Sequence, residues 1–106
     1  ITHGFKDNNI VNAIKNNEVD ENFHITPSDT DLYSMVRLED INYFKDEASL
    51  TRVNIVSQDG PSDYLRQTIN KMDDETFNIY IRYHLSTCER KELLGASSHV
   101  LDILKK

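Results

Sequence analysis

The stretch "HLSTCERKELLGASSHVLDILKK", residues 84–106, decides the fold because it joins the end of a helix to a strand within a few residues. Polar and apolar side chains alternate in its last part, with Val100 and Asp102 on one side and Leu101 and Ile103 on the other. A period of two residues predicts a strand, here near 98–104. Gly95 is the predicted C-cap residue of the helix that precedes this strand.

That helix has the clearest periodicity in the sequence and is predicted over 74–90. Asp73 is its predicted N-cap, and the acidic residues that follow suit the positive end of the helix dipole. One stripe of side chains recurs at helical spacing: Phe77, Tyr80, Ile81, His84, Leu85 and Cys88. The stripe predicts a core-facing side on which His84 and Cys88 are largely buried.

A second strand is predicted at 50–57, "LTRVNIVS", where Val53 and Ile55 share one side and polar residues the other. The "QDGP" turn at 58–61 ends this strand and suits the start of a helix, since proline fits a first helical turn. One face of that helix is marked by Leu65, Ile69 and Met72.

The N-terminal half is predicted to be mostly helical. Asp7 is the expected N-cap of a first helix that carries Ile10, Val11 and Ile14 on one face. The polar stretch 16–31 is interpreted as a surface connection. Ser28 or Thr30 is then expected to cap a short helix, and two runs at helical spacing follow: Leu32, Met35 and Val36, then Leu38, Ile41 and Phe44. Two strands alone make a poor sheet, so further strands lie either in this half or outside the sequence.

Composition restricts the class of protein. A length of 106 residues supports one domain with a modest core, and no apolar run approaches the roughly 18 residues that cross a membrane. The only cysteine, Cys88, excludes an internal disulfide and suits the cytoplasm. A net charge of −6 repels nucleic acid. We therefore expect a cytoplasmic protein without membrane or nucleic-acid partners. Ile1 in place of methionine leaves open a trimmed protein or a fragment.

Three segments carry a resemblance to a known family. "DETFNIYIRYHLSTCERKELLGASSHVLDILKK" (74–106), "RLEDI" (37–41) and "VSQDG" (56–60) resemble the C-terminal part of class I S-adenosylmethionine-dependent methyltransferases of Firmicutes. Those enzymes bind their cofactor through a glycine-rich loop, whereas this sequence has three glycines and no such loop. The resemblance implies that the chain follows the cofactor-binding half of the same protein, which is its expected partner. S-adenosylmethionine would bind the full-length protein only, and the isolated chain is expected to be inactive.

The resemblance also implies a fold. The family has a Rossmann-like α/β sheet of seven strands whose last strand is antiparallel, and an isolated C-terminal portion of it would be α+β. Strands six and seven would correspond to 51–57 and 98–104, with a helical pair inserted between them. That pair must leave and return at the carboxyl edge of the sheet, where ligands of open α/β sheets bind.

Six residues are candidates for binding a small-molecule methyl acceptor: His99, Asp59, Gly60, Tyr64, His3 and Phe5. His99 opens the last strand and could act as a hydrogen-bond partner or proton acceptor near neutral pH. Asp59 and Tyr64 could contact the acceptor, although Asp59 and Gly60 equally suit a plain tight turn. The resemblance alone places His3 and Phe5 near the acceptor. No catalytic residue is assigned.

Other readings of the same residues stay open. His84 and Cys88 have the i, i+4 spacing of metal ligands, but no further ligand group accompanies them, so no metal site is expected. Arg82, His84 and Ser86 also resemble the Arg-x-His-x-Ser string of LytTR-type DNA-binding domains, whose side chains hold phosphates. The helical context and the negative charge oppose this alternative. A small non-catalytic interaction module is the third possibility.

Overall fold

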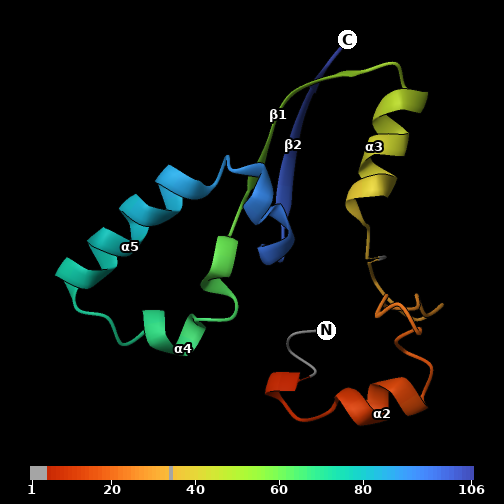
Figure 1. The fold of residues 1–106 in the computed structure, drawn as a ribbon, viewed down its shortest axis with the longest axis horizontal. Coiled ribbons are helices and arrows are strands. Elements are labelled where there is room, and N and C mark those ends of the chain that lie inside the picture. Colours follow the sequence, from red (N-terminus) through yellow and green to blue (C-terminus); the bar gives the residue numbers. More distant parts are fainter. Residues whose placement is uncertain (1–4, 34) are drawn as a thin grey trace. The chain divides into compact units, whose positions relative to one another are not determined.

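The computed structural model describes residues 5–33 and 35–106 and divides the chain into two compact units, Ile1–Ile41 and Asn42–Lys106. The boundary falls within helix α3 (Leu38–Glu47). The architecture is α+β, because several short helices accompany one antiparallel sheet of two strands (Figure 1). No helix of the described residues is long and apolar enough to cross a membrane.

The first unit contains helix α2 (Ile10–Lys15). Its N-cap is Asn9, so the prediction of Asp7 as the cap is wrong. The physical reason is the backbone of Asn8, which has a φ of 56° and separates Asp7 from the helix. Of the predicted apolar face, Ile10 is buried while Val11 and Ile14 are largely exposed.

The stretch 16–31 is mostly exposed, which confirms it as a surface connection, and a single bridge between Val19 and Ile25 closes a small loop within it. Among the described residues that follow Ser28 and Thr30, no helix forms before α3, so the helix predicted there is not seen, and Leu32, Met35 and Val36 are exposed. Side chains occupy the local backbone donors instead: the Ser28 N–H donates to Asp31 Oδ2 (2.8 Å) and the Thr30 N–H to Ser28 Oγ (3.3 Å). Such local bonds compete with helix formation.

The second unit is built on strands β1 (Thr51–Ser57) and β2 (Val100–Lys105), which pair antiparallel and lie side by side in Figure 1. Both predicted strands are confirmed to within two residues. Between them the chain forms short helical turns and two helices: η1 (Gly60–Ser62), α4 (Arg66–Ile69), α5 (Asp74–Thr87) and η2 (Lys91–Ala96). The helix predicted around Leu65 is shorter than expected, since Leu65 is the N-cap of α4 and Met72 lies beyond its end.

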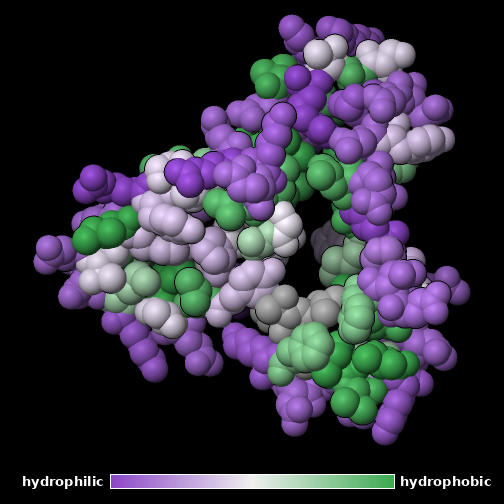
Figure 2. Space-filling model, in the orientation of Figure 1, coloured by the Kyte–Doolittle hydropathy of each residue, from purple (hydrophilic) through white to green (hydrophobic). Residues whose placement is uncertain are grey.

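A bulge at Val53 changes which side chains of β1 share a face. The register passes from Arg52↔Leu104 to Asn54↔Ile103, which leaves Val53 as the extra residue. Val53 is 60% exposed and Ile55 only 4%, so the prediction that they share one side is wrong. The apolar side chains Leu101 and Ile103 remain exposed on β2, and Figure 2 shows hydrophobic atoms at the surface among hydrophilic ones.

Helix α5 begins as predicted, since the Thr76 N–H donates to Asp73 Oδ1 (2.8 Å). It ends with Cys88 as C-cap, so Gly95 is not its cap but part of η2. The predicted stripe is split: Tyr80, His84 and Cys88 are half-buried, whereas Phe77, Ile81 and Leu85 are exposed. Thr87 replaces them as the buried residue of the helix. The expected burial of Leu85 is therefore wrong in this chain.

Candidate functional site

The candidate site lies where β1 ends and β2 begins. Because Ser57 is paired with Val100, the residues just beyond this pair, Gln58 and His99, continue opposite each other. The Gln58 N–H donates to the carbonyl of His99 at 3.0 Å. This extension of the strand pairing brings Asp59 next to His99, although 40 positions separate them in the sequence.

Asp59 and His99 form a dyad whose carboxylate is held from several directions. Nδ1 of His99 lies 2.8 Å from Oδ2 of Asp59. The other carboxylate oxygen, Oδ1, accepts from the His99 backbone N–H (2.9 Å) and lies 2.7 Å from Ser97 Oγ. Ser97 Oγ also lies 2.6 Å from the carbonyl of His99, and its one proton can serve only one of these acceptors at a time. The dyad thus links the two strand ends through side chains and backbone.

The electrostatics of the dyad follow from these contacts. Burial raises the pKa of Asp59, but hydrogen bonds from the His99 ring, from Ser97 and from the His99 backbone outweigh it, so its pKa lies below the usual value. The hydrogen bond to Asp59 and the charge of that carboxylate raise the pKa of His99. The His99 side chain is 72% exposed, so solvent weakens this effect while leaving the ring accessible.

Gly60 is part of the same cluster for a steric reason. Its φ of +51° lies in the left-handed region, and a Cβ placed there would come within 3.0 Å of Nδ1 of His84. The Gly60 N–H donates to Ser97 Oγ at 3.0 Å, which fixes the hydroxyl that contacts Asp59. Gly60 therefore permits both the turn and the close approach of α5.

Asp63 was not among the predicted site residues, but it also contacts this cluster. Asp63 follows η1 and accepts a hydrogen bond from Ser98 Oγ (2.8 Å), which ties it to the residue before His99. Tyr64 is half-buried in the turn between η1 and α4. Phe5 is exposed and belongs to the first unit, and His3 lies outside the described residues. The structure thus brings together Asp59, Gly60 and His99 from the predicted set and adds Ser97.

Helix α5 is fastened to the end of β1 next to this cluster. The Ser57 N–H donates to the carbonyl of Cys88 (2.7 Å), and Nε2 of His84 donates to the carbonyl of Gln58 (3.1 Å). A small cavity of about 60 Å³ lies at this junction and is lined in part by His84, Cys88 and Ser57. Ser57 Oγ is buried and has no hydrogen-bond partner within the described residues. His84 therefore joins α5 to the end of β1.

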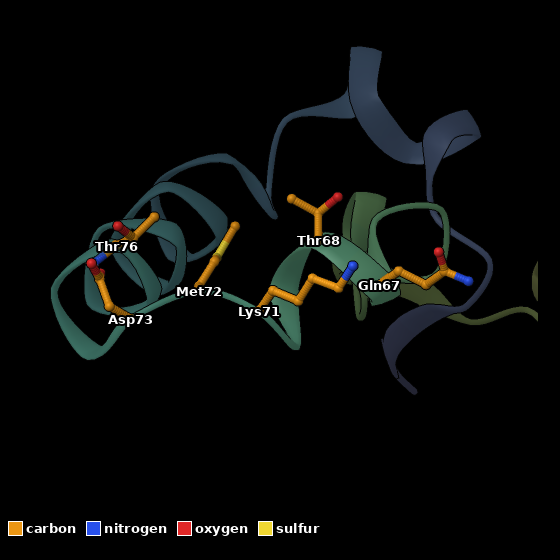
Figure 3. Close-up of a pocket in the computed structure, with 6 residues that line it drawn as sticks. All are labelled: Gln67, Thr68, Lys71, Met72, Asp73 and Thr76. Atoms are coloured by element: carbon orange, nitrogen blue, oxygen red, sulfur yellow. The ribbon is translucent and has the colours of Figure 1, made fainter.

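A larger groove lies between α4 and the start of α5, with a volume of about 490 Å³ (Figure 3). Its lining residues are Gln67, Thr68, Lys71, Met72, Asp73 and Thr76. Asp73 and Thr76 already bind each other in the N-cap of α5, and the groove contains none of the predicted site residues. The groove is larger than the cavity beside His84, but the contact between the Asp59 carboxylate and the His99 imidazole lies outside it.

The alternative readings of the sequence can be placed on the structure. Within residues 5–33 and 35–106 no three His, Cys, Asp or Glu side chains group in a way that could hold a metal ion. Arg82, His84 and Ser86 lie on α5, where successive members of the set are about 200° apart around the axis and so do not form one face.

No family model matches this sequence, and no curated protein or solved structure matches it either.

Proposed function

We propose that this chain forms the C-terminal, substrate-side portion of an S-adenosylmethionine-dependent methyltransferase, with Asp59 and His99 facing the methyl acceptor. The observation that carries the proposal is the antiparallel pair β1–β2 with a helical insertion that leaves and returns at one end. This arrangement agrees with what the resemblance implies for the last two strands of a Rossmann-like sheet. The dyad follows the carboxyl end of β1, which is the side where such sheets bind ligands.

The exposed apolar surface supports the same proposal. A sheet of two strands is marginal by itself, and Leu101 and Ile103 on β2 remain exposed to solvent. In the complete sheet that we propose, a further strand and covering helices would bury such side chains. The exposed Phe77, Ile81 and Leu85 on α5 would be covered in the same way.

The cofactor does not fit the residues of this chain alone. Of the glycines that the structure describes, Gly60 is packed against His84 and Gly95 lies in η2, so neither forms a phosphate- or nucleoside-binding loop at a long helix. S-adenosylmethionine, bound elsewhere in the complete protein, would supply the methyl group. The share of this chain is to bind and orient the acceptor.

The test has two parts. The reading frame upstream of Ile1 is expected to encode a strand followed by a glycine-rich loop. Calorimetric titration with S-adenosylmethionine should then give no binding to the 106-residue chain and binding to the complete product, which should release S-adenosylhomocysteine when supplied with an acceptor. Micromolar binding to the isolated chain, or a complete product that does not bind the cofactor, would overturn the proposal.

A further inference from the structure

We propose that His99 accepts a proton from the bound methyl acceptor through Nε2, that Asp59 is the positioning residue that orients its ring, and that the acceptor therefore carries an O–H or N–H group. The inference rests on the proposed function, because it assigns the chemistry of the same site. It does not apply to acceptors that react without losing a proton.

The position of the ring is fixed through one nitrogen only. Asp59 is ionised, so its carboxylate can only accept, and Nδ1 of His99 must donate across the 2.8 Å between them. In the neutral imidazole a proton on Nδ1 leaves Nε2 with a lone pair. The side-chain hydrogen bond described for the His99 ring goes through Nδ1, and the side chain is exposed. Nε2 is thus the nitrogen that can receive a proton from a ligand.

Hydrogen bonds to Asp59 hold its carboxylate in the position that orients the His99 ring. Oδ1 is held by the His99 backbone N–H, and Ser97 Oγ lies beside it. Ser97 is in turn held by the backbone N–H of Gly60. Because the strand pairing of β1 and β2 fixes these backbone groups, the carboxylate has little freedom to turn away from the ring. A group that is held in advance by its neighbours loses little entropy when a ligand binds.

The proposed step is a single proton transfer from the acceptor to His99. The O–H or N–H bond of the acceptor breaks, its proton passes to Nε2, and the electron pair stays on the acceptor atom, which becomes the stronger nucleophile. The ring becomes an imidazolium ion. Asp59, at the end of β1, and Asp63, after η1, both place negative charge near it and stabilise that ion.

The first experiment measures the ring directly and does not depend on catalysis. Long-range ¹H–¹⁵N spectra of the labelled chain, recorded above the pH at which His99 loses its charge, should show Nδ1 protonated and Nε2 unprotonated. Asp59→Asn should reverse this preference. The asparagine NH2 group would take the place of Oδ2 and donate an N–H to Nδ1, so Nδ1 would have to be the unprotonated nitrogen. Ser86→Ala, which removes an exposed hydroxyl that donates to the Tyr83 carbonyl within α5, is the control and should leave the tautomer unchanged.

A neutral wild-type ring that carries its proton on Nε2 would overturn the inference. Should Asp59→Asn fail to fold, the wild-type tautomer still decides the point.

The second experiment uses the complete enzyme. His99→Gln should lower kcat by about 10²- to 10⁴-fold, leave the KM of the acceptor within a few-fold, and remove the acid limb of the pH–rate profile. Ser86→Ala, whose hydroxyl bonds the Tyr83 carbonyl within α5, should leave kcat and the profile unchanged. If the wild type transfers methyl groups while His99→Gln keeps both its rate and its acid limb, the proton-acceptor role is wrong and the proposed function stands. If the wild type transfers no methyl group to any acceptor, the proposed function fails, and the inference fails with it.

Discussion

Arg52 on β1 and Asp102 on β2 form a bidentate ion pair across the sheet. Nε of Arg52 lies 2.7 Å from Oδ1 and Nη2 lies 2.6 Å from Oδ2, and Nη1 donates to Asn42 Oδ1 in α3 at 2.8 Å. The two side chains are only 24% and 11% exposed. The pair therefore links the start of β1 to the middle of β2 and ties Asn42 of α3 to them.

Arg52→Lys should destabilise the chain by about 1–3 kcal/mol, because a lysine cannot make the paired hydrogen bonds to a carboxylate. Urea unfolding at neutral pH measures the free energy. The matched control is Arg66→Lys, since Arg66 pairs with Asp63 while 72% exposed. Its cost is expected below about 1 kcal/mol. Equal costs for the two variants would show that the geometry of the Arg52 pair adds no stability.

Gly60→Ala should cost about 1–3 kcal/mol, because alanine is strained at a φ of +51° and its Cβ would approach His84 to 3.0 Å. Gly95→Ala is the control. No atom lies within 4 Å of a Cβ at Gly95 and no positive φ constrains it, so that variant should be as stable as the wild type or slightly more stable. Thermal melts of both variants decide the matter, and a Gly60→Ala melt unchanged from wild type would contradict the tight contact with His84.

Ile55→Ala and Leu85→Ala should differ sharply in the 106-residue chain. Ile55 is 4% exposed, and its truncation should cost about 2–5 kcal/mol. Leu85 is 68% exposed, so the same change there should cost about 0.5 kcal/mol or less. In the complete protein, the cost of Leu85→Ala should rise if another part of the protein covers α5. A large cost already in the isolated chain would mean that Leu85 is buried there.

The elements with strong local signals could be predicted from the sequence. Both strands and the N-cap at Asp73 follow from alternation and from capping chemistry, which act over a few residues. The helix predicted after Ser28 shows where periodicity fails: in the described part of that segment Leu32, Met35 and Val36 are exposed, and side chains bond to the local backbone. The bulge at Val53 could not be predicted from the alternation of residues in β1, because it depends on how β1 pairs with β2.

Part of the candidate site could also be predicted from local sequence signals. Asp59 and His99 could be selected as residues at the ends of two strands, but their contact depends on register, which single-strand patterns do not determine. Ser97 lies in the same entry to the last strand as His99 but was not among the candidate residues, since the sequence does not show which hydroxyl contacts Asp59. The spacing of the apolar residues predicts one stripe along α5. Which of those residues are buried depends on the elements that pack against the helix, and the sequence does not show these.

The DNA-binding alternative predicts salt-sensitive binding that this chain should not show. A fluorescence anisotropy titration with duplex DNA at low salt should find no appreciable affinity, because the net charge is −6 and Arg82, His84 and Ser86 do not share one face of α5. His84 is also engaged with the Gln58 carbonyl. A steep salt dependence that disappears in Arg82→Ala, while Arg66→Ala retains it, would favour the DNA-binding alternative.

The stability of the chain should have a maximum in mildly acidic solution. The pKa values of Asp59 and Asp102 are lowered in the folded state, so their contribution is present above about pH 4 and is lost as the pH falls through the folded values. The pKa of His99 is raised, so its contribution is fully present below about pH 6.5 and is lost as the pH rises through the folded value.

Urea unfolding from pH 3 to pH 9 should therefore show a loss of stability on both sides of a range of roughly pH 4–6.5. His99→Gln should flatten the alkaline loss and leave most of the acid loss, which Asp102 still causes through its pair with Arg52. Asp102→Asn should reduce the acid loss to the part that Asp59 causes and leave the alkaline loss unchanged. If wild type and His99→Gln lose the same stability between pH 6 and pH 9, the hydrogen bond between His99 and Asp59 does not form in solution.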